Sequence, residues 1–277
     1  MSKKIFFLSG IPRSGSVLLA SILAQNPKFH TTSTSPLYGL LKNINDNWNI
    51  YSSNLNTLNL KQKNNVCKSV FNSYYKHVDK DIILDKSRGW PSYINFLKDI
   101  DINQPKILAT VRDIPEVISS LFSVYNKDNP NYFNATLDAC NLKNNNLNKC
   151  KIIWDQKKIV FSKLVSHNGV SIPWNSLKYG YENFKKYIHL IDYNDLINDP
   201  NTTLKNIYNF LEIDPYKKHK FKNLFNNSPE PDKELYGATG IHDIYPVLKR
   251  YSKPAKEILG EETYNYFYNQ KLEFWKK

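Results

Sequence analysis

The chain has 277 residues, a formal net charge of +13 and a hydrophobic content of 41%. This length and this apolar content suit one large globular domain and exclude a disordered chain. No apolar stretch reaches the length of a membrane span, and no signal-peptide pattern is present. The positive charge favours anionic partners. Because the lysines are spread along the whole chain and form no basic block interleaved with aromatic residues, no specific nucleic-acid surface is expected.

The cysteines point to a reducing environment. Cys67, Cys140 and Cys150 show no CxxC spacing, so they predict no metal site. An odd number of cysteines without a secretion signal is typical of free thiols, and we therefore expect a cytoplasmic protein.

The first thirty residues read as a buried strand, a tight loop and the start of a helix. An apolar run ending at Ser9 leads into the loop 10–16, and an amphipathic segment begins at Val17. Such a loop presents main-chain N–H groups and the positive end of a helix dipole, which together favour an anion. Its small residues let a phosphate group approach the backbone.

This loop departs from a nucleotide-binding P-loop. Gly10 and Gly15 have the required spacing, but Ser16 stands at the position of the lysine and Val17 at that of the Mg²⁺-binding hydroxyl. Phosphoryl transfer from ATP relies on that lysine and on a metal. With Arg13 as its only cation, the loop is predicted to bind a phosphate group without a metal. An ordinary strand–turn–helix junction is the alternative.

A second buried strand is expected at 81–85, after an extended run at 28–32 and two helices within 37–77. It leads directly into Lys86. Open α/β sheets bind ligands at the carboxyl ends of their strands, so Lys86 is a candidate cation near the loop. By position alone it could equally be a solvated lysine of a turn.

The third strand, 106–111, ends at Arg112, and a helix is expected to follow it. Ser120 lies about two turns along that helix. A planar guanidinium together with a hydroxyl suits a phosphate monoester. The adjacent Ser119 is an alternative contact, and a structural ion pair is an alternative role for the arginine.

The second half of the chain carries fewer patterns. The Asn-rich stretch 127–150 suits either a lid or acceptor insertion or mere surface padding. Tyr193 follows a further predicted strand, and a glycine-broken loop at 228–250 contains Thr239 and His242. The other expected segments are a helix at 151–166, a loop at 169–173, an amphipathic segment at 176–186, a strand at 187–192, a helix at 202–211 and a closing helix at 261–274.

Three of these motifs resemble those of sulfotransferases that use 3′-phosphoadenosine 5′-phosphosulfate (PAPS). The run Pro12-Arg13-Ser14-Gly15-Ser16 after a strand looks like the 5′-phosphosulfate loop of the bacterial and tyrosylprotein branches. The segment from Arg112 to Ser120 is similar to the family's 3′-phosphate motif, Arg-(Asp/Asn)-x-Pro-x-x-x-x-Ser. The segment from Tyr193 to Pro200 and the helix after it resemble the family's Tyr-Glu-Asp-Leu segment.

The resemblance implies a single α/β domain, with a P-loop-like parallel sheet flanked by helices on both faces. It implies sulfuryl transfer from PAPS to a hydroxyl or amine of a small-molecule, carbohydrate or peptide acceptor, without a metal, releasing 3′-phosphoadenosine 5′-phosphate (PAP). The 228–250 loop would cover donor and acceptor. The implied donor-binding residues are Pro12, Arg13, Ser14, Gly15, Ser16, Val17, Arg112, Ser120 and Tyr193, and the implied catalytic residues are Arg13, Lys86 and His242.

Lys86, 26 positions before Arg112, resembles the transition-state lysine of tyrosylprotein sulfotransferases. Two departures leave questions open. Val17 replaces a hydroxyl residue, so one phosphate contact is absent. The glutamate base of the tyrosylprotein branch has no counterpart near Thr34, which puts a tyrosine-peptide acceptor in doubt.

Three residues remain candidates for the base. They are His30, His242 and Asp85. A histidine has a pKa that suits acid–base catalysis, although a histidine in a loop is usually only a polar residue exposed to solvent. A P-loop kinase and a non-catalytic polyanion-binding protein are the alternative functions, and the sequence does not determine the oligomeric state or the acceptor.

Overall fold

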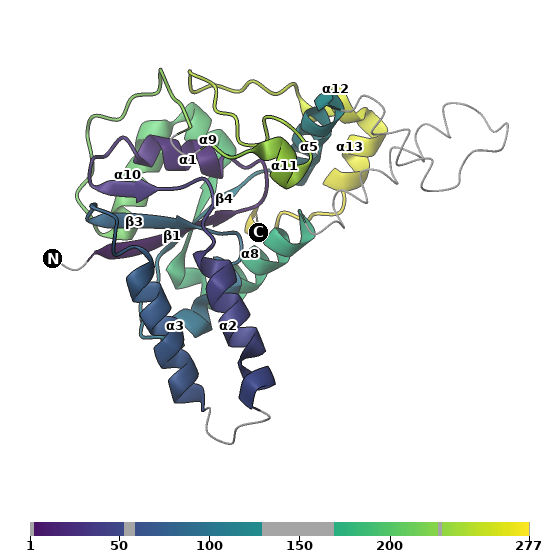
Figure 1. Ribbon diagram of the computed structural model, residues 1–277. Coiled ribbons are helices and arrows are strands. Elements are labelled where there is room, and N and C mark those ends of the chain that lie inside the picture. Colours follow the sequence, from purple (N-terminus) through teal and green to yellow (C-terminus); the bar gives the residue numbers. More distant parts are fainter. Residues whose placement is uncertain (1–2, 53–58, 129–168, 227–228, 277) are drawn as a thin grey trace, which may run out of the picture.

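A computed structural model describes residues 3–52, 59–128, 169–226 and 229–276. In this part of the chain, five parallel strands form one sheet in the order β2-β3-β1-β4-β5 (Figure 1). The strands are β1 Lys4–Gly10, β2 Phe29–Thr31, β3 Ile82–Lys86, β4 Ile107–Val111 and β5 Ile188–Asp192. The predicted parallel α/β sheet is confirmed.

Both faces of the sheet are buried. Phe7 on β1 belongs to one apolar cluster, whereas its neighbours Phe6 and Leu8 belong to the other. On β3, Ile83 joins the cluster of Phe7, while Leu84 joins that of Phe6 and Leu8. Side chains on a strand alternate between faces, so these continuous apolar runs require helices on both sides.

The helices form a layer on each face of the sheet, as Figure 1 shows. Helices α1 (Ser16–Leu23), α9 (Tyr193–Asn198) and α10 (Pro200–Leu211) pack on the face of Phe6 and Leu8. The opposite face is covered by α2 (Leu37–Ser52), α3 (Leu60–Tyr74), α4 (Ile94–Asp99), α5 (Ile114–Asp128), α8 (Ser171–Phe184), α12 (Ala255–Leu259) and α13 (Glu261–Tyr268). The short elements η1 Trp90–Tyr93, η2 Lys185–Tyr187, α11 Asp232–Tyr236 and η3 Phe274–Lys276 connect them.

Some element boundaries differ from the prediction. Helix α8 begins at Ser171 rather than near 176. Pro173 lies in its first turn, where main-chain N–H groups have no partner within the helix, so proline costs no hydrogen bond there. Helix α13 ends at Tyr268 rather than near 274. The predicted lid or acceptor insertion at 127–150 and the helix at 151–166 fall outside the described residues, apart from the end of α5.

The strand order creates the edge at which the site forms. From the central β1 the chain passes to β2 and β3 on one side, and then to β4 and β5 on the other. All five strands point the same way, so Lys86, the loop after β1, Arg112 and Tyr193 follow one another along the carboxyl edge. This is the position at which open α/β sheets bind their ligands. None of the described helices is long and apolar enough to cross a membrane.

Candidate active site

The loop after β1 lies directly against β4. Gly10 has φ 144°, and a Cβ there would lie 2.3 Å from Thr110 Oγ1 and 2.5 Å from the Thr110 carbonyl oxygen. Ser14 is fully buried, and its Oγ lies 2.6 Å from both the Ile11 carbonyl oxygen and Thr110 Oγ1. Its hydroxyl therefore holds the loop on the sheet, which leaves the main-chain N–H as the group of Ser14 that suits an anion.

The loop turns through two left-handed residues before α1 begins. Arg13 has φ 58° and Gly15 has φ 88°. This backbone costs a non-glycine residue about 1–2 kcal/mol, so the conformation at Arg13 is maintained by its surroundings. Gly15 is the N-cap of α1 but supplies no side-chain cap, and the first turn carries no acidic residue. The first N–H groups of α1 therefore suit an anionic ligand.

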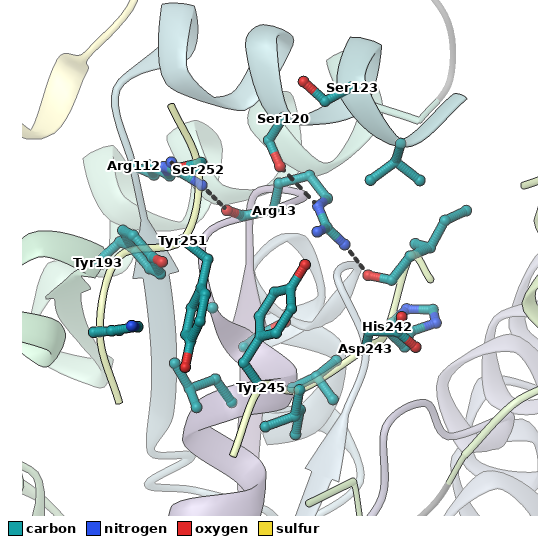
Figure 2. A pocket seen from close by; sticks show the side chains of 18 of the residues that line it. Arg13, Arg112, Ser120, Ser123, Tyr193, His242, Asp243, Tyr245, Tyr251 and Ser252 are labelled. Carbon is teal, nitrogen blue, oxygen red and sulfur yellow. Dashed lines mark hydrogen bonds between the residues drawn. The ribbon is translucent and has the colours of Figure 1, made fainter. Parts of the chain in front are cut away.

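A cavity of about 370 Å³ opens at this edge of the sheet (Figure 2). Most of the residues that the sequence predicted for the site line this cavity, although they come from separate elements. Those residues are Arg13, Gly15, Ser16, Val17, Lys86, Arg112, Ser120, Tyr193 and His242. Pro12 and Ser14 are buried in the loop and do not line it.

Arg112 is held in place from three directions. One Nη donates to the Arg13 carbonyl oxygen at 3.1 Å, and the other to Glu116 Oε2 at 3.1 Å and Ser252 Oγ at 2.9 Å. Its guanidinium carbon lies 4.4 Å from the centre of the Tyr193 ring. Burial lowers the pKa of Arg112, and Tyr193 and Glu116 oppose that shift. The guanidinium is thus a fixed cation at one end of the cavity.

Arg13 crosses the cavity between α5 and the C-terminal segment. Its Nε donates to Ser120 Oγ at 3.1 Å, and its Nη1 donates to the carbonyl oxygen of Ile241 (Figure 2). Burial lowers the pKa of Arg13, and the charge of Arg112 acts in the same direction. Two arginines this close favour a ligand with more than one negative charge.

Lys86 is 4% exposed and lies at the end of β3. Its Nζ donates to the carbonyl oxygen of Ser33. Burial and, to a smaller extent, the charge of Arg88 lower the pKa of Lys86 to about 7, although Glu230 and Asp232 oppose the shift. The ammonium group is therefore easily deprotonated, and a bound anion would restore its charge.

His242 is buried beside two carboxylates. Its Nδ1 lies 2.7 Å from Asp232 Oδ1 and 3.7 Å from Glu230 Oε2, and its main-chain N–H donates to Asp232 Oδ2 at 2.8 Å. Burial lowers the pKa of His242, Asp232 opposes this shift, and Lys86 reinforces it. The three side chains hold possible metal-ligand atoms within 4.8 Å of one another. Since Nδ1 already shares a hydrogen bond with Asp232, we assign no metal there.

The other candidates for the base lie outside the cavity lining. Asp85 is fully buried and bonded to Ser35 Oγ (2.5 Å), the Tyr75 hydroxyl (2.5 Å) and Trp90 Nε1 (2.7 Å), so it is a structural carboxylate. His30 lies in β2, and burial lowers its pKa. The hydroxyl of Thr239 donates to Asp128 at 2.7 Å instead of facing the cavity. Of the three candidates for the base, His30, Asp85 and His242, only His242 lines the cavity.

Sequence reasoning missed several lining residues, among them Arg88, Tyr245, Tyr251 and Ser252. The rings of Tyr245 and Tyr251 stack with centroids 4.0 Å apart and an interplanar angle of 19°. These residues lie in irregular segments, where no periodicity marks them. Their contribution becomes visible only when the C-terminal segment is placed over the sheet edge (Figure 2).

A family model described as "Sulfotransferase domain" matches residues 3–234. The sulfotransferase domain from the curacin biosynthetic pathway is 14% identical, with 98% of this chain and 97% of that chain covered and a TM-score of 0.52. A mouse sulfotransferase, SULT7A1, crystallised with PAP, is 16% identical over 99% of this chain and 86% of that one (TM-score 0.49). At such identities a structural likeness shows the fold alone. No curated protein sequence matches the chain significantly.

Proposed function

Because the chain belongs to the sulfotransferase family, we propose that the cavity at the carboxyl edge of the sheet binds PAPS and is the place of sulfuryl transfer. When bound, PAPS supplies the sulfuryl group that the enzyme transfers. The observation that carries the assignment is the convergence of three basic side chains, the buried Lys86 and Arg112 and the partly buried Arg13, beside the uncapped N-terminus of α1. Buried cations without a bound anion are costly, so this arrangement fits a polyanionic ligand.

We assign neighbouring groups of the cavity to the two charged groups that the ribose of the donor carries. The N–H groups of loop 10–16 and of the first turn of α1 would hold the 5′-phosphosulfate, together with Arg13 and Lys86. Arg112 would hold the 3′-phosphate with Ser120 and with Ser252, which already accepts a hydrogen bond from Arg112. In this assignment the fixed guanidinium of Arg112 binds the 3′-phosphate. The ammonium group of Lys86, whose protonation can change, lies where negative charge develops during the reaction.

The aromatic side chains of the cavity suit the purine. Tyr193 lies against Arg112 with one face and lines the cavity, and the stacked Tyr245 and Tyr251 line it from the C-terminal segment. Flat apolar surfaces with a few polar groups are typical of sites for planar ligands. The binding energy gained on the adenosine would then orient the distant sulfuryl group.

The reaction places negative charge on the sulfonate oxygens and on the leaving phosphate. Lys86, Arg13 and the loop N–H groups would stabilise that charge by electrostatics fixed before the reaction begins. On the other side of the sulfuryl group, His242 would take the proton of the acceptor. We infer a hydroxyl or amine of a small-molecule, carbohydrate or peptide acceptor, because an imidazole suits the deprotonation of either group.

The function can be tested with ³⁵S-labelled PAPS and a panel of acceptors comprising phenols, alkyl alcohols, monosaccharides, amines and tyrosine peptides. We expect labelled product and stoichiometric PAP with at least one class, and loss of both with Lys86→Ala. Transfer of ³²P from labelled ATP in the parallel assay, with no transfer from PAPS, would contradict the proposal and favour a kinase.

A further inference from the structure

The segment from Glu230 to His242 places two carboxylates around the imidazole of His242, which lines the cavity. It includes α11, which begins at Asp232, and the glycine-rich turn that precedes Ile241. Hydrogen bonds rather than sheet geometry hold this segment. Arg13 donates to the carbonyl oxygen of Ile241 and Thr239 donates to Asp128, while the bonds of Asp232 converge on His242.

A single carboxylate holds His242 at two points. Asp232 accepts the main-chain N–H of His242 through Oδ2 at 2.8 Å, and its Oδ1 lies 2.7 Å from Nδ1 of the ring. Asp232 is 9% exposed and His242 is 7% exposed. A carboxylate that accepts two bonds from one residue fixes the rotation of the ring as well as the position of the backbone. It also favours the tautomer in which Nδ1 carries the proton, because an ionised carboxylate can only accept.

The second carboxylate, that of Glu230, forms its hydrogen bond with a residue other than His242. Glu230 Oε1 accepts a hydrogen bond from the hydroxyl of Ser33 at 2.7 Å, and its Oε2 lies 3.7 Å from Nδ1 of His242. The side-chain amide of Asn226 donates to the carbonyl oxygen of His242 at 3.2 Å. The bond from Ser33 joins the segment to the chain that follows β2, and the bond from Asn226 joins it to the chain before Glu230. Glu230 and Asn226 therefore fix the segment, while Asp232 fixes the ring.

The charged groups that face His242 come from three parts of the chain. Asp232 comes from α11, Glu230 from the residues just before it, and Lys86 from the end of β3. The two carboxylates favour the protonated imidazole, whereas Lys86 and burial disfavour it. The imidazole is thereby kept neutral near pH 7 but able to accept a proton, as a general base requires.

We propose that Asp232 is a positioning residue that holds His242 with Nδ1 protonated, so that Nε2 is the atom that takes the acceptor's proton. The inference rests on the proposed function for its chemistry. The acceptor oxygen or nitrogen gives its proton to Nε2 as its electron pair forms the bond to sulfur. The bridging 5′-phosphate oxygen leaves with the electron pair of the broken S–O bond. The imidazolium afterwards releases the proton to water, which restores the starting state.

Nitrogen NMR of the ¹⁵N-histidine-labelled enzyme, with and without PAP, tests the positioning apart from any activity. His242→Gln identifies the resonances of His242 among the six histidines. We expect neutral His242 to be protonated at Nδ1, and Asp232→Asn to lose that preference and lower its pKa. A neutral His242 protonated at Nε2 in the unmodified enzyme would overturn the proposal, whatever the enzyme transfers.

Kinetics provide the second readout. Activity should fall as the pH drops through the pKa of His242, because the base must be neutral. Asp232→Asn should lower kcat by about 100-fold or more, with little change in the KM for PAPS, and should shift the acidic limb of the profile to lower pH. Asp232→Glu should restore part of kcat. Glu234→Gln, which neutralises an exposed carboxylate of the same helix, is the matched control.

A reduced plateau without movement of the acidic limb would indicate a merely structural role and would overturn the proposal. Failure of the proposed function has a different signature, since the unmodified enzyme would then transfer no label from PAPS to any acceptor. The NMR result would still decide the orientation of the ring in that case.

Discussion

The two walls of the cavity are built in different ways. One wall, which we call the strand wall, consists of Lys86, the loop 10–16 and Arg112, which lie at the ends of three neighbouring strands, so the spacing of the parallel sheet sets their separation. The other wall, residues 229–259, contains only the short helices α11 and α12 among irregular chain, and we call it the irregular wall. Strand ends can hold a polyanion rigidly, whereas an irregular wall can be adapted to different acceptors without altering the donor site.

The second wall depends on the first for its position. Arg13 donates to the carbonyl oxygen of Ile241, Arg112 donates to Ser252, and Glu116 binds both Arg112 and Arg250. The cations that would bind the donor thus also anchor the C-terminal segment. Filling the donor site should therefore influence how the acceptor side is ordered.

The largest effect should come from Lys86 on the strand wall. Lys86→Ala should lower kcat by about 100- to 1,000-fold, the usual result of removing one preorganised donor to developing charge. The Kd for PAP should rise by a much smaller factor, because the free lysine is partly neutral and must take up a proton before it attracts the bound anion. Steady-state kinetics and calorimetry measure the two quantities. An unchanged kcat would remove Lys86 from the mechanism.

Substitution of Arg112 should affect the Kd for PAP more than kcat. Arg112→Ala removes a buried guanidinium and leaves Glu116 without that partner, so the Kd for PAP should rise by about 100-fold, at 1.5–3 kcal/mol for each charged hydrogen bond. The matched control is Lys217→Ala, which removes one exposed positive charge elsewhere. If both variants weaken binding equally, general attraction and not a specific site holds the nucleotide.

A smaller effect should measure what the irregular wall adds to donor binding. Ser252→Ala deletes one acceptor of Arg112 and should raise the Kd for PAP by about threefold to tenfold, the cost of one ordinary hydrogen bond. Calorimetry at a single pH is sufficient. A Kd equal to that of the unmodified enzyme would restrict the donor site to the strand wall.

The smallest effect is a linked proton. Because the pKa of Lys86 is lowered to about 7, the free enzyme lacks part of this proton at pH 7.5, and a bound anion should restore it. PAP binding should therefore take up a fraction of a proton, detected by calorimetry in buffers of different ionisation enthalpy. Lys86→Arg, which stays charged, should abolish the uptake. Proton release would contradict the account.

The same shift has a consequence for stability. Between pH 7 and about 10 the unfolded chain binds more protons at this lysine than the folded enzyme does. The contribution of Lys86 to stability therefore rises with pH across this window. A comparison of denaturant unfolding for the enzyme and for Lys86→Met should show that trend in the difference between them.

The strand wall could be predicted from sequence because strand periodicity and loop composition place Arg13, Lys86 and Arg112 at one edge. The role of Ser14 could not be foreseen in full, since its hydroxyl faces Thr110 and this depends on how closely β1 and β4 approach. For the irregular wall Thr239 and His242 were singled out, from their place in a loop that resembles the family's covering loop and, for His242, from the usual pKa of histidine; only His242 lines the cavity. Asp232, ten positions away, contacts it through a fold-back that no periodic pattern marks.

For the fold as well, the periodic segments could be predicted from the sequence, while the short or irregular ones could not. The five strands and the principal helices were apparent from apolar runs, whereas α4 was missed because it follows a 3₁₀ turn and has only Ile94–Asp99. The start of α8 was misplaced because Pro173 looks like a breaker until its position in the first turn is known.

Titration of the enzyme with PAP and with ATP in the calorimeter tests the central claim most directly. The account predicts one saturable PAP site per chain that persists in chelator, and ATP binding at least about tenfold weaker with or without Mg²⁺, since the loop lacks the lysine and hydroxyl of a nucleotide P-loop. MgATP binding more tightly than PAP, or PAP retention that never saturates and disappears with salt, would contradict it.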